Sequence, residues 1–311
     1  MSRILITPRS LTAGGHPALA RLEKAGYEVV YCTPGKQPSE DELLALLPGC
    51  VGYLAGVEPV SAKVLTAATE LRVISRNGVG IDNVDLQEAA AHNIAVCKAE
   101  GANARGVAEL AMALMFALAR AVPSSDAAIK AGDWQRRQGI ELLDRTIGIV
   151  GCGRIGRTVA QLATGIGMNV IGYDPYPSKD ANITFASLDE VVARADVITL
   201  HCPPRKDGGP VLDAAMLGTV KPGVLIVNTA RHALIDREAL AAALEADRVG
   251  GVALDVFATE PPERDTLLSD PRVIATPHIG GFTQESVDRA VGAAVDNILE
   301  VLKTAAANNP A

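Results

Sequence analysis

The sequence predicts an α/β protein of two domains, each a parallel β-sheet covered by helices on both faces. Short apolar runs alternate with helical stretches along the whole chain, which is the order that parallel strands and crossover helices require. At 311 residues the chain is long enough for about two such domains. A strand followed by a glycine-rich turn, which usually opens a domain of this class, begins only at Thr146. A second domain therefore starts near the middle of the chain.

The N-terminal third supplies the first sheet. Apolar runs such as RILIT and YEVVYC predict strands, and Ser39 and Glu42 are spaced as a capping box that opens a helix. Strands are predicted at 3–7, 27–32, 51–56, 71–75 and 94–98, with helices at 16–25, 39–47, 62–68 and 85–91.

The middle of the chain predicts a second sheet. A long apolar helix runs from Asn103 to Val122, and a shorter one runs from Ser124 to Trp134. Six strand-like runs follow with helices between them, at 147–150, 168–174, 196–202, 224–230, 251–257 and 272–278. Six parallel strands with intervening helices make one complete doubly wound domain.

The last helical segment, 283–305, carries an apolar stripe that needs a surface to cover. Six of its residues fall on one helical face: Val287, Val291, Ala294, Val295, Ile298 and Leu302. The middle domain already has its own helices, so we expect the stripe to return to the N-terminal sheet. The predicted domains are therefore a discontinuous one, 1–98 plus 283–311, and an inserted one, 99–282.

Composition and charge exclude several classes of partner. The chain has 36 Asp and Glu against 29 Lys and Arg, a formal net charge of −7, and no basic cluster. We therefore expect neither nucleic acid nor an anionic membrane as a partner. The most apolar run, Leu110–Ala119, is too short to span a bilayer, and no signal-peptide pattern opens the chain.

The cysteines favour a reducing compartment. They are scattered and form no C-x-x-C pair, which argues against a disulfide framework and against a thiolate metal site; they are Cys32, Cys50, Cys97, Cys152 and Cys202. The spacing of His, Asp and Glu also matches no metal-ligand set. We expect a cytoplasmic protein that binds no metal.

The run Gly151-Cys152-Gly153-Arg154-Ile155-Gly156 follows an apolar strand and leads into a helix, which is the context of a dinucleotide-binding turn. Gly151 permits the tight turn, Gly153 lets the backbone approach a pyrophosphate, and Gly156 lets the helix pack closely on the strand. The helix N-terminus offers N–H groups to the phosphates. The alternative is an ordinary glycine-rich turn, which the surrounding strands and helices disfavour.

Asp174 ends the next strand, about 20 positions beyond the glycine motif, as in domains that bind NAD. Its carboxylate can accept hydrogen bonds from ribose hydroxyls and would repel a 2′-phosphate. No Lys or Arg follows it until Lys179. We therefore expect NAD rather than NADP, the alternative being that Asp174 only forms a turn before Pro175.

Three polar residues follow the later strands of this domain, where ligands bind in such folds: Arg231, Glu260 and His278. A histidine suits acid–base catalysis near neutral pH, a neighbouring carboxylate stabilises its protonated form, and an arginine holds an anionic substrate. Each alone could be a surface or structural residue. Together, beyond a dinucleotide motif, they favour hydride transfer between a secondary alcohol and a nicotinamide.

Five motifs occur in the order typical of one enzyme family: RNGVGIDNVD, GCGRIGRTVA, NTARHALID, ALDVFATEPP and TPHIGG. In these motifs, over nearly its whole length, the chain resembles the D-isomer-specific 2-hydroxyacid dehydrogenases, most of all their phosphoglycerate dehydrogenase branch. The resemblance implies a Rossmann NAD-binding domain inserted into a flavodoxin-like substrate domain, and a homodimer joined through the NAD-binding domains. It implies His278 as acid–base catalyst, Glu260 as its partner and Arg231 as a clamp on the substrate.

The resemblance also assigns ligand contacts. The substrate carboxylate is expected on the backbone N–H groups of Asn77, Gly78, Val79 and Gly80, with Arg231 and His278 completing the substrate site. Asp255 is expected to contact the nicotinamide carboxamide. The expected cofactor contacts are Gly151, Gly153, Arg154, Ile155, Gly156, Asp174, Cys202, Pro203, Thr229, Ala230 and Asp255.

Two departures from the family bear on the substrate. The stretch Ala55-Gly56-Val57-Glu58 stands where phosphoglycerate dehydrogenases of the animal type resemble RSAT, so the arginine expected near a substrate phosphate is missing. Glu58 would repel a phosphate unless Arg105, Arg136, a partner subunit or another cation compensates. His232 follows the catalytic arginine where the family commonly has glycine, which changes the shape of the site. The chain ends after the last helix, so we also expect no appended regulatory domain.

The leading hypothesis is an NAD-dependent dehydrogenase that interconverts a D-2-hydroxy acid and its 2-oxo acid. A second hypothesis keeps the site and changes the substrate to hydroxypyruvate, glyoxylate, phosphoglycerate or a sulfonated lactate. A third is a nucleotide-sensing protein similar to the C-terminal-binding corepressors. Tight NADH binding without turnover would favour that third hypothesis.

Overall fold

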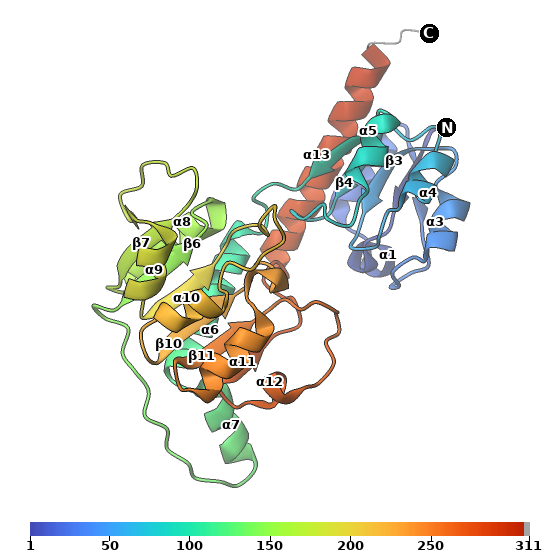
Figure 1. The fold of residues 1–311 in the computed structure, drawn as a ribbon. Coiled ribbons are helices and arrows are strands. Elements are labelled where there is room, and N and C mark those ends of the chain that lie inside the picture. Colours follow the sequence, from blue (N-terminus) through green and yellow to red (C-terminus); the bar gives the residue numbers. More distant parts are fainter. Residues whose placement is uncertain (308–311) are drawn as a thin grey trace. The chain divides into compact units, whose positions relative to one another are not determined.

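The computed structural model describes residues 1–307, with side chains as far as residue 304. The chain divides into two compact units (Figure 1). The first unit joins Met1–Asn103 to the segment that begins at Thr283, and the second unit is Ala104–Phe282. The sequence analysis put the first boundary after residue 98, and the last four residues of its first domain, 308–311, lie outside the described residues.

The first unit contains a five-stranded sheet in the order β2-β1-β3-β4-β5, with every neighbouring pair parallel. This is the strand order of flavodoxin-like folds, so the predicted class of the first domain is confirmed. The strands are β1 (Arg3–Ile6), β2 (Glu28–Tyr31), β3 (Cys50–Ala55), β4 (Val73–Arg76) and β5 (Ala95–Lys98).

Helices cover both faces of the first sheet, because each helix has an apolar side that must be buried. One face carries α3 (Glu40–Leu46), α4 (Ala62–Ala67) and α5 (Leu86–Ala91). The other carries α1 (Arg9–Gly14), the 3₁₀ turn η1 (Pro17–Leu19), α2 (Ala20–Lys24) and α13 (Gln284–Ala307). The predicted helix at 16–25 therefore begins as η1 and continues as α2.

The predicted capping box at α3 is half formed. The Ser39 hydroxyl accepts from the N–H of Glu42 at 3.2 Å. The Glu42 carboxylate does not return to Ser39 but accepts from the N–H of Thr33 at 2.7 Å. The cap thus ties α3 to the loop after β2.

The C-terminal helix completes the core of the first unit, as its apolar stripe predicted. Val291, Val295 and Ile298 are fully buried against the first sheet, in one cluster with Ile4 and Ile6. Polar contacts fix the helix along its length. The Asn297 amide donates to Ser75 Oγ and to the Lys98 carbonyl, each at 3.2 Å, and Arg289 donates to the Ala102 carbonyl at 2.8 Å.

The second unit contains a seven-stranded parallel sheet in the order β12-β11-β10-β9-β6-β7-β8. Counted along the unit, this contains the Rossmann order, so the predicted class of the second domain is confirmed. The sequence predicted six strands and missed β8, a two-residue strand too short to form an apolar run. The strands are β6 (Thr146–Val150), β7 (Asn169–Tyr173), β8 (Thr184–Phe185), β9 (Val197–Leu200), β10 (Val224–Asn228), β11 (Val249–Leu254) and β12 (Val273–Ala275).

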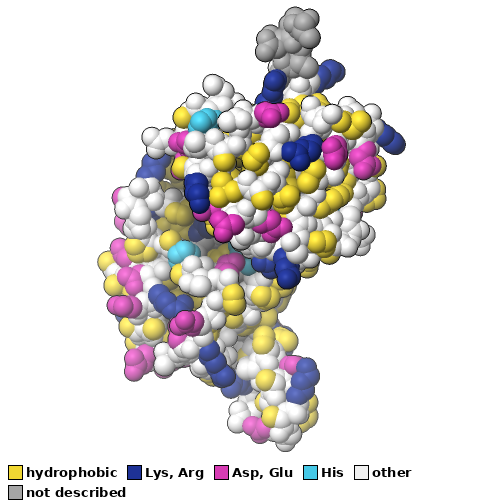
Figure 2. Space-filling view, turned by 90° about the vertical axis from the view of Figure 1, so that its right-hand side faces the viewer, with side chains coloured by type: hydrophobic (Ala, Val, Ile, Leu, Met, Phe, Trp, Pro, Cys, Tyr) yellow, Lys and Arg dark blue, Asp and Glu magenta, His cyan; other side chains and the backbone are white. Residues whose placement is uncertain are grey.

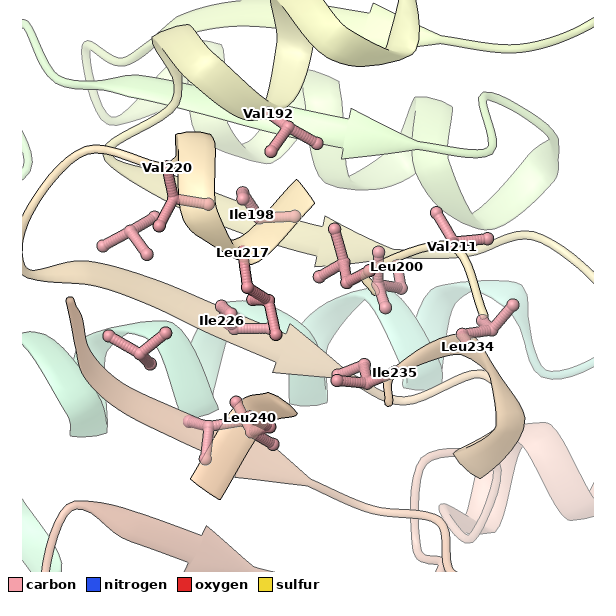
Figure 3. Close-up of a cluster of buried hydrophobic side chains, with 14 of the residues drawn as sticks. Val192, Ile198, Leu200, Val211, Leu217, Val220, Ile226, Leu234, Ile235 and Leu240 are labelled. Carbon is pink, nitrogen blue, oxygen red and sulfur yellow. The ribbon is translucent and has the colours of Figure 1, made fainter. Parts of the chain in front are cut away.

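Two layers of helices bury the faces of the second sheet. One face packs against α9 (Leu188–Arg194), α10 (Ala214–Thr219) and α11 (Arg237–Glu245), with Val192, Leu217 and Leu240 reaching toward Ile198 and Ile226 of the strands (Figure 3). The other face packs against α6 (Ala104–Ala119) and α8 (Arg154–Gly165). The short α12 (Thr266–Ser269) and the 3₁₀ turn η2 (His232–Leu234) lie in the loops.

The long apolar helix predicted from residue 103 is α6, and eight of its residues are buried. It ends before Ala121, whose φ of 51° is left-handed, and α7 (Val122–Lys130) follows. The predicted end of that second helix at Trp134 is wrong, because α7 stops at Lys130. Within residues 1–307 no single helix is long and apolar enough to cross a membrane; α6 and α7 together would pass that test, but the chain bends by 62° between them.

The surface mixes charges of both signs. On the face shown in Figure 2, basic and acidic side chains are interspersed. Exposed ion pairs one helical turn apart, such as Arg105 with Glu109 and Arg194 with Glu190, contribute little stability. In the described part of the chain, no three His, Cys, Asp or Glu side chains gather as they do around a metal ion.

Candidate active site

The carboxyl ends of parallel strands lie at one edge of a sheet, and this edge of the second unit collects the predicted functional side chains. The glycine turn follows β6, Asp174 follows β7, Thr229 and Arg231 follow β10, Asp255 and Glu260 follow β11, and His278 follows β12. Of the other expected cofactor contacts, Arg154 and Ile155 begin α8, Cys202 and Pro203 follow β9, and Ala230 precedes Arg231.

The glycine turn is built as the sequence predicted. Gly151 has φ of +93°, and a Cβ there would lie 2.6 Å from the Cys202 nitrogen and from the His201 carbonyl. A Cβ on Gly156 would lie 2.1 Å from the Gly151 oxygen. Gly153, the N-cap of α8, has no atom within 4 Å of the place where its Cβ would be. The turn therefore packs tightly against its own strands and leaves space at Gly153, which is the fit that a pyrophosphate needs.

Asp174 is half-buried beside this turn. One carboxylate oxygen accepts from the Cys152 N–H and the other from the Tyr176 N–H, both at 2.9 Å. Arg157 of α8 reaches Ser178 just beyond and lies 3.9 Å from Asp180. Sequence reasoning missed Arg157 because it is distant along the chain from Asp174. The Asp180 carboxylate already faces the Arg157 guanidinium.

Two buried polar atoms at this edge have no partner among the described residues: Thr229 Oγ1 and His201 Nδ1. Thr229 is 8% exposed. The other ring nitrogen of His201, Nε2, is hydrogen-bonded to the Thr199 hydroxyl at 2.8 Å. Burial lowers the pKa of His201 to about 3, so the ring is neutral at physiological pH. Unpartnered buried polar atoms are costly, and a polar ligand such as a dinucleotide would supply the partners.

The thiols in this region are not reactive groups. Burial raises the pKa of Cys152 to about 12 and that of Cys202 to about 11, with the nearby Asp174 adding to both shifts. Both side chains remain protonated near neutral pH. They form packing surface around the turn and supply neither a nucleophile nor a metal ligand.

His278 and Glu260 are brought together as the sequence analysis expected. His278 Nδ1 lies 3.0 and 2.9 Å from the two carboxylate oxygens of Glu260. Both side chains are about half exposed, at 52% and 41%. The Phe257 N–H donates to the same carboxylate at 3.2 Å. Because a carboxylate only accepts, Nδ1 carries the proton, and Nε2 of the neutral ring is left as a base.

Asp255 holds the turn that carries His278, a role that sequence reasoning missed. The backbone of His278 is left-handed, with φ of 53°. The Asp255 carboxylate, 1% exposed, accepts from Thr276 Oγ1 at 2.6 Å, from the Ile279 N–H at 2.8 Å and from the Gly280 N–H at 2.8 Å. Sequence analysis expected this carboxylate to contact nicotinamide, and that contact stays a prediction. In the structure its oxygens accept from one donor before His278 and two after it.

Arg231 follows β10, the strand paired with β11, and Asn228 fixes its loop. The Asn228 side chain accepts from the Ala230 N–H at 3.0 Å and donates to the Arg231 carbonyl at 2.8 Å. Arg231 Nη1 donates to the Ala230 carbonyl at 2.7 Å. His232, the residue that departs from the family, is exposed and lines a hollow of about 190 Å³ together with Phe257 and Ala258.

The expected carboxylate loop lies at the carboxyl end of β4 in the first unit. Its carbonyl groups are engaged, since Gly78 accepts from the Ala99 N–H at 2.9 Å and Gly80 from Arg76 Nε at 2.8 Å. Within the described residues, the N–H groups of Gly78, Val79 and Gly80 donate to no acceptor. Asn77 Oδ1 is buried there without a partner. The loop thus presents donors to an anion.

Comparisons with known proteins agree with this architecture. A family model described as D-isomer specific 2-hydroxyacid dehydrogenase, NAD binding domain, matches residues 112–280. The chain is 42% identical over 260 residues to a D-3-phosphoglycerate dehydrogenase of Mycobacterium tuberculosis, covering 81% of this chain and 49% of the relative. It therefore spans about half the length of that relative. It is 38% identical to a hydroxypyruvate reductase of Thermotoga maritima, covering 85% of this chain and 88% of the relative.

A solved structure, the TT0316 protein of Thermus thermophilus, superposes with a TM-score of 0.89 at 36% identity, covering 97% of each chain. The two parallel sheets and the glycine turn agree with the family that the matched residues indicate. The chain belongs to the D-isomer-specific 2-hydroxyacid dehydrogenase family, and its second unit contains the NAD-binding domain of that family.

Proposed function

We propose that the chain is an NAD-dependent oxidoreductase that interconverts a D-2-hydroxy acid and its 2-oxo acid. The observation that carries the proposal is the contact of His278 with Glu260 at 2.9 Å, at the edge of the sheet that also bears the glycine turn. A half-exposed imidazole backed by a carboxylate is the arrangement needed to accept a proton from a substrate hydroxyl.

Each residue has a chemical role in this proposal. Nε2 of neutral His278 accepts the hydroxyl proton as the carbonyl forms, and Glu260 stabilises the resulting imidazolium through Nδ1–H. Arg231 holds the substrate carboxylate and polarises the reacting oxygen through its planar donors. In the first unit, the backbone N–H groups of Gly78, Val79 and Gly80 are donors suited to a substrate carboxylate. In the reverse direction His278 returns the proton to the oxygen.

NAD is the proposed cofactor because the glycine turn and Asp174 suit it. The N–H groups at Gly153 and the start of α8 would hold the pyrophosphate, and Asp174 would accept from the ribose hydroxyls and repel a 2′-phosphate. Thr229 Oγ1 would gain a partner. The cofactor, when bound, takes hydride from the alcohol carbon or returns it to the carbonyl carbon.

We also propose a cytoplasmic homodimer joined through the second unit. Helix α7 buries none of its residues, and apolar side chains are exposed on it and on the segment that follows: Val122 at 53%, Ile129 at 56% and Trp134 at 81%. Such a group of exposed apolar residues marks a protein interface. Sedimentation of the wild type and of a Trp134→Ser, Ile129→Ser variant tests this, with a shift toward the monomer expected in the variant.

The activity is tested by following NADH consumption with glyoxylate, pyruvate, hydroxypyruvate and 3-phosphohydroxypyruvate, and by following NAD⁺ reduction with D- and L-2-hydroxy acids. We expect turnover with at least one oxo acid, a preference for NADH over NADPH, and oxidation of the D-enantiomer only. Saturable NADH binding without turnover of any acid would refute the proposal and favour a nucleotide sensor.

A further inference from the structure

Besides the segment that begins at Ala99, the carboxylate loop of the first unit touches the segment that follows β3. The Arg76 guanidinium joins them, since it donates to the Gly56 carbonyl and also, at 2.8 Å, to the Gly80 carbonyl. The Asn77 N–H donates to the Ala55 carbonyl at 2.9 Å. A small acid held on the N–H groups of residues 78–80 would therefore lie close to residues 56–59.

Glu58 in this segment points inward. Its side chain is 1% exposed, and its carboxylate accepts from Tyr53 Oη at 2.6 Å, from the Gly56 N–H at 2.8 Å and from the Thr7 hydroxyl. Burial and the Glu58 carboxylate raise the pKa of Tyr53 well above its ordinary value, so its hydroxyl remains a donor. The sequence analysis treated Glu58 as a charge facing the substrate, whereas the structure shows it locking the segment from behind.

The Glu58 side chain fills the space that a side chain at position 56 would need. A Cβ at Gly56 would lie 2.5 Å from Glu58 Oε2 and 3.3 Å from the Pro8 Cα. A side chain at position 56 would press on Oε2, whereas the three donors bond to Oε1. With Gly56 and Glu58 buried, Val57, 64% exposed, and Pro59 are the side chains of the segment that face outward.

The segment after β3 offers no cation to a second anion. Residues 55–59 contain one carboxylate, Glu58, and no Lys or Arg. Arg76 is 7% exposed, and backbone carbonyls accept its hydrogen bonds. A buried carboxylate repels an anion through protein more strongly than through water. A phosphate beside Val57 would lose hydration and gain no cation from this segment.

We propose that residues 56–58 form a specificity element that restricts the substrate to 2-hydroxy and 2-oxo acids with an uncharged side chain, and that disfavours phosphorylated acids. The inference rests on the proposed function and adds the substrate class. It favours acids such as glyoxylate, pyruvate and hydroxypyruvate over 3-phosphohydroxypyruvate. Val57 is the residue that meets the variable part of the substrate.

The first test compares kcat/KM for hydroxypyruvate and 3-phosphohydroxypyruvate with the full chain and saturating NADH. We expect the uncharged acid to be preferred at least tenfold. Equal or greater kcat/KM for the phosphorylated acid would overturn this inference and leave the proposed function standing, because a cation from elsewhere would then serve the phosphate. No turnover with any acid would overturn both.

The second test supplies the missing cation. Val57 is exposed, so Val57→Arg should fold, and Val57→Gln is the matched control for size without charge. We expect Val57→Arg to raise the ratio of kcat/KM for the phosphorylated acid to that for hydroxypyruvate at least fivefold, and Val57→Gln to change the ratio less than twofold. An unchanged ratio in folded Val57→Arg would show that residue 57 does not face the substrate, and would overturn the assignment.

Discussion

The two sheets differ in which groups lie at the carboxyl ends of their strands. In the second unit, side chains carry the chemistry, with Glu260 and His278 in direct contact after β11 and β12. In the first unit, the loop after β4 contributes backbone N–H groups, and its neighbour after β3 turns its charged side chain inward. In the function and specificity that we propose, the edge of the second unit reacts and that of the first selects. The residue types of a motif identify the first of these edges only.

Each edge also contains one buried carboxylate that accepts three hydrogen bonds. Asp255 grips the turn around His278, and Glu58 grips the segment that presents Val57. Both are 1% exposed. The two carboxylates therefore do the same physical work, which is to hold a loop in one conformation, and differ in what the loop offers.

The largest effect is expected when the reacting edge loses its base. His278→Ala should lower kcat about 10³-fold, the range for loss of a general acid–base group, with NADH affinity little changed. Exposed His92→Ala at the end of α5 in the first unit is the matched control and should stay within twofold. Steady-state kinetics and NADH fluorescence titration measure both, and a kcat within tenfold of wild type would remove His278 from the mechanism.

The next effect separates two roles of Asp255. Asp255→Asn turns one acceptor into a donor that faces a backbone N–H, so the His278 turn relaxes and kcat should fall about 10- to 100-fold. The KM for NADH should move less than threefold. A large rise in that KM with unchanged kcat would instead support the nicotinamide contact expected from sequence.

The selecting edge is tested by removing one backbone donor. Val79→Pro deletes the N–H at the centre of the carboxylate loop, and the KM for the oxo acid should rise about tenfold, as for a lost hydrogen bond to a charged group. Val79→Ala keeps the N–H and should leave KM within twofold. Thermal unfolding shows whether the proline variant is folded, and equal KM values in the two folded variants would contradict the loop's role.

A smaller effect is expected at the cofactor ribose. Asp174→Ala should raise the KM for NADH about tenfold and should narrow the preference over NADPH, because the repelling carboxylate is gone and Arg157 remains nearby. Asp180→Ala, beyond Arg157, serves as the comparison. An unchanged NADH to NADPH ratio in Asp174→Ala would place coenzyme selection elsewhere.

The smallest effect concerns stability. Burial lowers the pKa of His201 to about 3, so below pH ~6.5 the unfolded chain binds a proton that the folded chain does not. Stability should therefore fall as the pH drops from ~6.5 toward 3, by up to about 1.4 kcal/mol per pH unit from this group. Urea unfolding at pH 7, 6 and 5 should show a shallower decline in His201→Gln than in His92→Gln, and parallel declines would contradict it.

Structural features that depend on a short sequence period or a fixed motif could be predicted from the sequence. The alternation of strands and helices predicted both sheets, and the stripe from Val287 to Leu302 predicted that the last helix returns to the first sheet. The proposed pairing of Glu260 with His278 followed from their positions at neighbouring strand ends. In each case a local pattern carries the structural information.

Features that depend on hydrogen bonds between residues distant along the chain could not be predicted from the sequence. Glu58 meets Thr7 and Tyr53 only after β1 and β3 have paired, so its charge was assigned to the wrong side of the loop. Asp255 and the Thr276–Gly280 turn are joined in the same way across two strands. Strand β8 was missed because two residues have no periodicity. Helix α7 ends at Lys130, just before Gly132, whose φ of 81° is left-handed.

The return of α13 to the first sheet has a consequence for synthesis. Ile4 and Ile6 leave the ribosome first, yet the Val291, Val295 and Ile298 side chains that cover them arrive about 285 residues later. The inserted unit, Ala104–Phe282, is contiguous and can fold while one face of the first sheet is not yet buried by α13. In nascent chains halted before residue 284, the inserted unit should therefore resist protease, while the N-terminal segment stays accessible to chaperones.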